Sequence, residues 1–243
     1  MDYEALYQAI FHRKSVRKYD AVPLGGEPVQ KLQELIGTLQ PLCPEIGTQI
    51  KILSPEQLKS NAPQSVGFYS EKKEGYRMNA GFMMEQIDLF LSANNIGACW
   101  LGMAKPVKGV LTPPQGMEYV SRLCFGTPAQ EMHRSAPAEF KRNTLNEISD
   151  VTDLYHVLEA VRLAPSAMNS QPWFFSGTPE RLTVSRKKSM MLDKLNQIDI
   201  GIALCCLWLS LKHQGKEAVF DFSPATVSKG RIFMANVSVK DAE

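Results

Sequence analysis

Two apolar segments of this sequence resemble each other, and this similarity constrains the fold more than any other feature. Aligned without gaps, residues 81–97 (GFMMEQIDLFLSANNIG) correspond to residues 199–215 (DIGIALCCLWLSLKHQG). The identical pairs are Leu89/Leu207, Leu91/Leu209, Ser92/Ser210 and Gly97/Gly215. Upstream, residues 50–58 (IKILSPEQL) and 174–182 (FFSGTPERL) line up in the same order, each with a strand followed by a Pro-containing turn. Two collinear matches indicate an internal duplication, so we expect two related halves.

Hydrophobic periodicity predicts both helices and strands in each half. The expected helices are residues 3–12, 29–39, 78–95, 154–163 and 198–213, and the expected strands are 49–53, 119–125, 173–176 and 181–185. Residues 54–75 are polar and are expected to form a loop, and residues 129–150 to form a connection. A boundary near residues 148–152 divides the chain into a first half, 1–150, and a second half, 151–243.

Composition and charge exclude several classes of protein. A net charge of +2 over 243 residues is too small to imply binding to nucleic acid or to a membrane surface, because those partners require clustered basic faces. The five cysteines are odd in number and lack paired spacing, which fits reduced thiols. The N-terminus has no basic segment before an apolar run, and the apolar run 198–211 is too short and interrupted to span a bilayer. We therefore expect a cytoplasmic protein whose partner is a small molecule.

A basic motif follows the first expected helix. In the segment RKSVR, residues Arg13, Ser15 and Arg17 alternate and would project together from an extended chain. Guanidinium groups and a hydroxyl suit a phosphate monoester, because charge-assisted bidentate hydrogen bonds are strong. A basic stretch at a helix end also interacts favourably with the helix dipole without any ligand. Spacing alone leaves both interpretations open.

A second motif, APSAMNSQPW at residues 164–173, concentrates short polar side chains between a helix and a strand. Ser166, Asn169 and Gln171 offer hydrogen-bonding groups without formal charge, which suit the edge of a flat heteroaromatic ring such as a flavin. Pro, Ser and Asn are equally typical of an ordinary turn after a helix. This motif alone is therefore ambiguous as well.

Together, the two motifs resemble the signatures of the FMN-dependent nitroreductase family. The resemblance covers most of the chain: residues 94–102 (NNIGACWLG) look like the segment after the family's central helix, 125–128 (FGTP) like its Gly-x-Pro strand end, and Lys141-Arg142 like its late basic phosphate contacts. It implies an α+β nitroreductase-like fold with antiparallel-rich central sheets flanked by helices.

The order of the motifs departs from the family pattern. The Pro-Ser-x-x-Asn-x-Gln-Pro-Trp element normally precedes the central helix, but here it follows residue 160, and the second half lacks Arg-x-Ser-x-Arg. Family members are usually homodimers with FMN at the interface. The hypothesis is that two tandem half-domains form an intrachain pseudo-dimer, as in the Thermotoga-type nitroreductase subgroup, with one complete FMN site and one degenerate site. We therefore expect a monomer.

The resemblance assigns roles to individual residues. It implies that Arg13 and Ser15, with Lys141 or Arg142, hold the FMN phosphate, and that Arg17 lies on the phosphate or the N1/O2 edge, where a cation favours the anionic reduced flavin. Lys14 is a weaker candidate. Ring and ribityl contacts are expected from Pro165, Ser166, Asn169 and Gln171, and a backbone N–H near N5 from Leu101 or Gly102.

The activity that follows from the resemblance is transfer of hydride from NADH or NADPH to a small electron-poor acceptor, such as a nitroaromatic or a quinone, by a ping-pong mechanism. The expected cofactor is FMN, and no catalytic acid or base and no metal is assigned. The alternatives are a flavin-binding protein with no nitroreductase activity or with specialised flavin chemistry, and a nucleotide- or anion-binding module without flavin.

Overall fold

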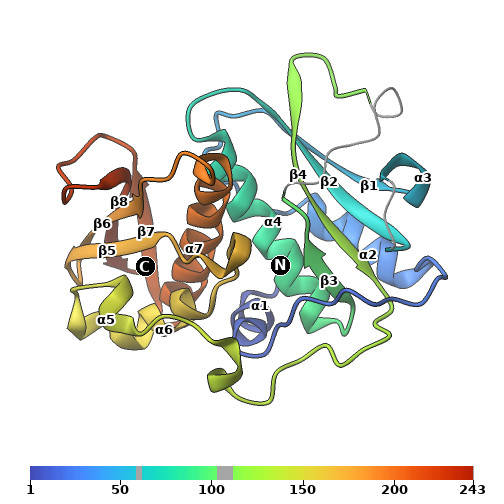
Figure 1. The fold of residues 1–243 in the computed structure, drawn as a ribbon, viewed down its shortest axis with the longest axis horizontal. Coiled ribbons are helices and arrows are strands. Elements are labelled where there is room, and N and C mark those ends of the chain that lie inside the picture. Colours follow the sequence, from blue (N-terminus) through green and yellow to red (C-terminus); the bar gives the residue numbers. More distant parts are fainter. Residues whose placement is uncertain (59–61, 103–111, 243) are drawn as a thin grey trace.

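The computed structural model describes residues 1–58, 62–102 and 112–242, which form two four-stranded antiparallel sheets and the helices that flank them (Figure 1). The helices are α1 (Tyr3–Ile10), α2 (Glu27–Ile36), α3 (Pro55–Leu58), α4 (Tyr76–Ala93), α5 (Leu145–Ile148), α6 (Tyr155–Leu163) and α7 (Asp193–His213). The strands are β1 (Thr48–Leu53), β2 (Gln64–Glu71), β3 (Gly97–Trp100), β4 (Met117–Gly126), β5 (Trp173–Thr178), β6 (Arg181–Lys187), β7 (Lys216–Asp221) and β8 (Arg231–Asp241).

The two sheets have the same strand order. The first is β1-β2-β4-β3 and the second is β5-β6-β8-β7, so each strand of one sheet has a counterpart at the same place in the other. In both sheets an irregularity interrupts the pairing of the two central strands, between Phe68 and Tyr69 and between Val184 and Ser185. The expected α+β fold with antiparallel sheets and flanking helices is confirmed.

The long helices α4 and α7 cross at the centre of the molecule, and glycine makes the crossing possible (Figure 1). A Cβ on Gly81 would lie 2.1 Å from the carbonyl oxygen of Ile198, and a Cβ on Gly201 would lie 1.9 Å from that of Met78. Each helix therefore presents a glycine to the backbone of the other. This reciprocal contact is the pattern expected of a two-fold interface.

The reciprocal contact identifies which residues of the two helices are equivalent. Gly81 pairs with Gly201 and Met78 with Ile198, and the same offset pairs Asn95 with Gly215, the left-handed residues that follow α4 and α7. The ungapped alignment of identities is wrong by two residues, because it pairs Gly215 with Gly97. A helix-ending glycine displaced by two residues, about half a turn, is enough to shift such an alignment, since both helices are apolar throughout.

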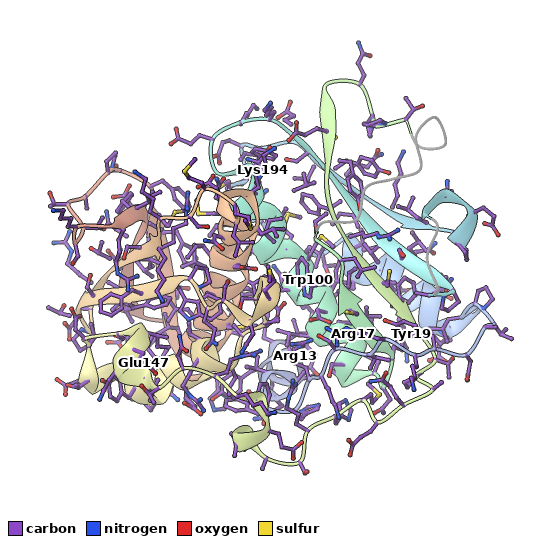
Figure 2. The ribbon with its side chains drawn as sticks, in the orientation of Figure 1. Arg13, Arg17, Tyr19, Trp100, Glu147 and Lys194 are labelled. Carbon is purple, nitrogen blue, oxygen red and sulfur yellow. The ribbon has the colours of Figure 1, made fainter. Side chains whose placement is uncertain are left out.

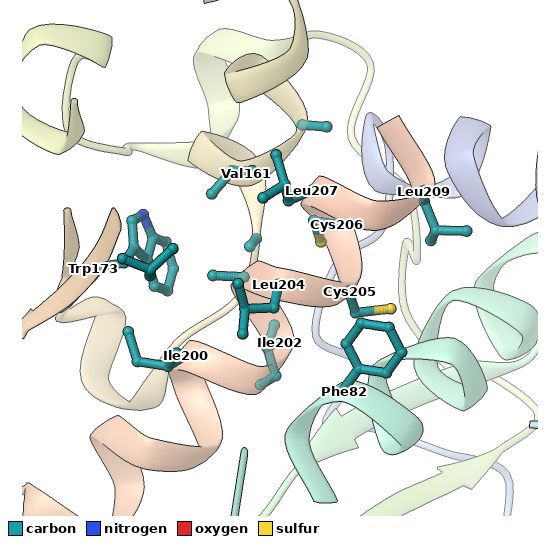
Figure 3. Close-up of a cluster of buried hydrophobic side chains, with 14 of the residues drawn as sticks. Phe82, Val161, Trp173, Ile200, Ile202, Leu204, Cys205, Cys206, Leu207 and Leu209 are labelled. Carbon is teal, nitrogen blue, oxygen red and sulfur yellow. The ribbon is translucent and has the colours of Figure 1, made fainter. Parts of the chain in front are cut away.

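The helices share one hydrophobic core that contains side chains of both halves. Figure 3 shows Phe82 of α4 beside Cys205 of α7, with Trp173 of β5 on the other side of α7. The cysteines Cys43, Cys99, Cys124, Cys205 and Cys206 are all buried and free. The expected boundary near residue 150 falls between α5 and α6.

Several elements differ from the sequence expectations. Residues 54–75, expected to be a loop, contain α3 and the central strand β2, and β3, β7 and β8 were not predicted. The strand β2 is buried on both faces and carries small residues such as Ser65, Gly67 and Ser70, so it lacks the alternation of an exposed strand. Helix α7 begins at Asp193; its 21 residues are long and apolar enough to cross a membrane, contrary to expectation, and 78% of the apolar window is buried in the structure.

Candidate functional site

A cavity lies where the two halves meet, and both halves line it. Its volume is about 150 Å³. The first half contributes Ser15, Arg17, Cys99, Trp100, Gly102 and Ser121, and the second half contributes Pro165, Ser166, Ala167, Met168, Leu195, Ile198, Asp199 and Ile202. Figure 2 shows Arg17 and Trp100 near the centre of the molecule, beside the chain of the second half. The cavity therefore brings together the two motifs that are far apart in the sequence.

Arg13 supports the cavity from behind and does not line it. Its side chain is 3% exposed, and its Nε lies 3.0 Å from the Asp88 Oδ2. Its Nη2 donates to the Ser15 Oγ at 3.3 Å, so the Ser15 hydroxyl keeps its own proton to donate. Burial and the neighbouring Asp88 raise the pKa of Glu85, one turn away on α4, well above its ordinary value. The role of Arg13 is to position Ser15 and to neutralise a buried carboxylate.

Arg17 is the cation that lines the cavity. Its backbone N–H donates to the Gln130 Oε1 at 3.2 Å, while its guanidinium makes no hydrogen bond or ion pair with any residue in the described ranges. Lys14, between the two arginines, turns to the surface and pairs with Glu131 at 2.9 Å. Within the basic motif, Arg17 is therefore available to a ligand, whereas Arg13 is engaged with Asp88.

A group of guanidinium groups lies near Arg13. Burial and the positive charges of Arg13 and Arg134 lower the pKa of Arg142 to about 10. Arg134 donates to the Arg13 carbonyl oxygen. The sequence analysis did not identify Arg134, because this residue lies in the polar connection 129–150 and belongs to neither motif. Three arginines close enough to repel one another form an environment that favours an anion.

The second motif divides into residues that line the cavity and residues that hold the loop. Pro165 and Ser166 line the cavity, and the Ser166 Oγ accepts from the Gln171 N–H at 2.9 Å. Asn169 accepts from Arg142 and donates to the Lys141 carbonyl oxygen at 3.0 Å. Gln171 accepts from the Asn143 N–H at 2.8 Å. Asn169 and Gln171 therefore fasten the loop to the segment after residue 140.

The backbone of this loop is strained. Met168, Asn169 and Gln171 have φ angles of 53°, 56° and 44°, in the left-handed region that non-glycine residues rarely adopt. Lys141, the neighbour of Asn169, also has a φ of 52°. Such strain persists only where the surroundings enforce it, and it is concentrated at functional sites. Here it holds Met168, 80% exposed, at the mouth of the cavity.

The segment after β3 contributes Trp100 and Gly102. The Leu101 N–H already donates to the Arg122 carbonyl oxygen at 3.0 Å, so it is not available to a ligand, which corrects one of the two expected donors. Gly102 lines the cavity, where a Cβ would lie 2.9 Å from the Leu195 Cδ2. The Trp100 side chain lines the cavity, and its Nε1 donates to the Asp88 Oδ2 at 3.1 Å. Trp100 is therefore a residue of the cavity wall and not only of the hydrophobic core.

Asp199 is the cavity residue that the sequence analysis missed. It is 3% exposed; its Oδ1 accepts from the Ala167 N–H at 3.0 Å, and its Oδ2 has no hydrogen-bond partner among the described residues. Burial raises the pKa of Asp199 to about 7. The Ser121 Oγ on the opposite wall is likewise unpartnered. A signal was available, because Asp199 is the one acidic residue in the apolar run 198–211.

Comparison with known proteins places the chain among nitroreductases. The family model described as "Putative TM nitroreductase" matches residues 5–211. The structure is similar to that of a putative nitroreductase from Thermotoga maritima MSB8, with TM-score 0.66 and 22% identity over 97% of this chain and 93% of that chain. A nitroreductase family protein from Clostridium difficile 630 aligns with TM-score 0.49 and 14% identity over 59% of this chain and 94% of its own. No curated protein sequence matches the chain.

The family match covers most of the chain, and the structural similarity to the Thermotoga protein runs through both sheets. Both agree with the two motifs that the fold brings to one cavity. The chain therefore belongs to this Thermotoga-type nitroreductase family, a family of oxidoreductases.

Proposed function

We propose that the chain is an FMN-dependent oxidoreductase that transfers hydride from NADH or NADPH to a small electron-poor acceptor, such as a nitroaromatic or a quinone, in a ping-pong cycle. The observation that carries the proposal is the cavity between the halves, which is lined by Ser15 and Arg17 of the first half and by Ser166 of the second; the Arg17 guanidinium has no hydrogen-bond or ion-pair partner among the described residues. Membership of the family supports the reaction class, and the residues around the cavity support FMN as the cofactor.

The residues present fit FMN. Arg17 and Ser15 can donate to a phosphate, and the mutual repulsion of Arg13, Arg134 and Arg142 favours an anion nearby. Ser121 also lines the cavity, and its buried Oγ has no hydrogen-bond partner among the described residues, which suits a donor or acceptor on the edge of a flavin ring. The cavity is smaller than the roughly 300–1,000 Å³ of typical ligand pockets, so such a ligand would extend across its mouth.

When bound, FMN supplies the hydride chemistry, and the chain supplies position and electrostatics. Ser15 and Arg17 would hold the phosphate, Pro165 and Ser166 would contact the ring from the second half, and the Gly102 N–H would donate from the first half. Arg13, Asn169 and Gln171 act indirectly, because their polar groups are engaged with the protein.

We further propose that the protein acts as a monomeric pseudo-dimer in the cytoplasm. Both walls of the cavity belong to the same chain, so a second copy is not needed to complete it. The five free, buried cysteines support a reducing compartment.

The experiment is to measure the visible spectrum of the purified protein and to titrate released FMN against chain concentration. We expect bound flavin, and turnover of NADH or NADPH with a quinone. Arg17→Ala should weaken FMN binding by about tenfold or more, since a charge-assisted hydrogen bond contributes about 1.5–3 kcal/mol. Lys14→Ala is the matched control, because it removes the same charge from the same motif at a residue paired on the surface.

Each alternative predicts a different result. A yellow protein without turnover would identify a flavin-binding protein or one with specialised chemistry. A colourless protein that cannot be reconstituted with FMN would contradict the proposed function and leave an anion-binding module.

A further inference from the structure

The equivalent positions of α4 and α7 differ at the residue that faces the cavity. The offset that pairs Gly81 with Gly201 pairs Asn79 with Asp199. In the first half, the Asn79 Oδ1 accepts from the backbone N–H groups of Leu42 (2.8 Å) and Cys43 (3.0 Å). In the second half, the Asp199 Oδ1 accepts from the Ala167 N–H at 3.0 Å. Asn79 thus holds the loop that follows α2, and Asp199 holds the loop that follows α6.

Loop holding does not require a carboxyl group. Asn79 does it with a neutral amide oxygen that accepts two N–H groups, and its Nδ2 has no hydrogen-bond partner among the described residues. Asp199 lines the cavity, accepts one N–H group and leaves a buried Oδ2 without a partner in the same part of the chain. Each side chain thus leaves one buried polar atom unsatisfied, but only the carboxyl group of Asp199 can release a proton and take it up again.

We propose that Asp199 is the proton donor to the acceptor bound in this cavity, an inference that rests on the proposed function. An acceptor carbonyl that gains a hydride also needs one proton to become a neutral hydroxyl group. The Oδ2–H bond of Asp199 breaks, a new O–H bond forms on the acceptor oxygen, and the carboxylate then regains a proton from solvent. Electrons come only from the hydride, so charge and atoms balance.

The surroundings of Asp199 are suited to this role. Burial raises its pKa to about 7, so that both the acid and the carboxylate are populated near neutral pH, which is the condition for efficient proton transfer. The other titratable groups that line the cavity are Arg17 and Cys99, and neither forms a hydrogen bond or ion pair with Asp199 among the described residues. Burial of Cys99 raises its pKa, which keeps that thiol protonated.

The test compares two acceptors that differ in their need for a proton. FMN-loaded enzyme is reduced with NADH without oxygen and then mixed rapidly with a benzoquinone or with ferricyanide, whose one-electron reduction takes up no proton. We expect Asp199→Asn to slow quinone reduction about a hundredfold, in line with general acid catalysis, and to leave ferricyanide reduction unchanged. The wild-type quinone rate should fall as pH rises through about 7, the pKa of Asp199.

A second readout does not depend on turnover. In protein labelled with ¹³C at the Asp side-chain carboxyl carbon, one resonance should titrate near pH 7 and should be missing in Asp199→Asn. Asp199→Asn keeps the Oδ1 that accepts from Ala167, so FMN binding and thermal stability report that the variant is folded. Asn79→Asp is the matched control, because it places a carboxyl at the equivalent position away from the cavity and should leave the ratio of the two rates unchanged.

The outcomes separate the two levels of the proposal. Equal loss of both rates, no loss of either, or the absence of a titrating Asp199 resonance would overturn the donor role while leaving the proposed function intact. A wild-type protein that does not quench added FMN fluorescence would overturn the proposed function, and the donor role with it.

Discussion

At the scale of single residues, the side chains of the site are distinguished by what they are already bonded to. Arg13 and Arg17 belong to one motif, yet Arg13 is buried against Asp88, whereas Arg17 lines the cavity and its guanidinium has no partner within the described residues. Asp199 has one donor for two oxygen atoms. Removing each of these groups therefore has a different expected effect on stability and on ligand binding.

The first prediction concerns the pH dependence of stability. Burial raises the pKa of Asp199 from 3.8 to about 7, so between these values the folded protein keeps a proton that the unfolded chain has released. Its contribution to stability is fully present below pH 3.8 and is lost as pH rises towards about 7, with a slope of up to about 1.4 kcal/mol per pH unit. Asp199→Asn should remove this component.

Urea unfolding of both proteins between about pH 5 and pH 8 checks this prediction. The wild type should lose stability relative to the variant up to pH 7 and then run parallel to it. Curves that are parallel throughout would show that the carboxyl does not bind a proton in the folded state.

The second prediction concerns Arg13. Because Arg13→Ala leaves the buried Asp88 carboxylate without its cation, we expect a loss of about 3–5 kcal/mol in the free energy of unfolding. Arg17→Ala should change stability by less than about 0.5 kcal/mol, since that side chain is exposed. Denaturant titration of the two variants measures the difference, and similar losses would contradict the assignment of Arg13 to a buried support role.

The sequence identified the motifs but not the partners of their residues. It predicted that Arg17, Ser15, Pro165, Ser166 and Gly102 belong to the site, and the structure brings these residues to one cavity. It could not separate Arg13 from Arg17, because the partner Asp88 lies on a helix far along the chain. The hydrogen bonds of Asn169 to Arg142 and Lys141 likewise join segments that are far apart in the sequence.

At the scale of elements, α7 crosses α4 in close backbone contact and also lines the cavity with Ile198, Asp199 and Ile202. Periodicity predicted both long helices, although α7 begins earlier than expected. It did not predict the central strand β2, whose two buried faces remove the alternation of polar and apolar residues. The predicted pairing of the helices failed for a similar reason, since uniformly apolar helices carry little register information.

The third prediction follows from that crossing. Gly201→Ala would place a Cβ 1.9 Å from the Met78 carbonyl oxygen. This clash cannot be relieved by a change of rotamer, because the oxygen belongs to the backbone. We expect a loss of about 3 kcal/mol or more, at the upper end of overpacking effects, together with weaker FMN binding. Gly25→Ala is the control, because nothing lies within 4 Å of its Cβ position. Thermal unfolding of both variants provides the comparison, and an unperturbed Gly201→Ala would disprove the close crossing.

At the scale of the whole molecule, the two halves share a strand order but differ at a position that lines the cavity in one of them. The residue equivalent to Ile202, which lines the cavity, is Phe82. Its ring is 2% exposed and packs against Trp208 at 5.3 Å and Phe220 at 5.9 Å between ring centroids. We therefore expect the larger side chain of Phe82 to leave no room for a ligand at the equivalent place in the other half.

The fourth prediction is therefore one FMN per chain, bound by a monomer of 27.1 kDa. Light scattering coupled to gel filtration, with the FMN content measured in the same peak, gives both values. The FMN-to-chain ratio should not change on dilution, because one chain provides both walls of the cavity. Two FMN per chain, or loss of FMN with dissociation of a dimer, would contradict the composite site.

The pairing of Asn79 with Asp199 has a consequence for how such a site can change. In an assembly of two identical subunits, every substitution occurs twice, so a residue that improves the reaction must also be tolerated at the symmetric position. A chain that carries both positions separately has no such constraint. Its carboxyl can be adjusted for proton transfer while its amide remains adjusted for loop stability, and a designer can alter either one without disturbing the other.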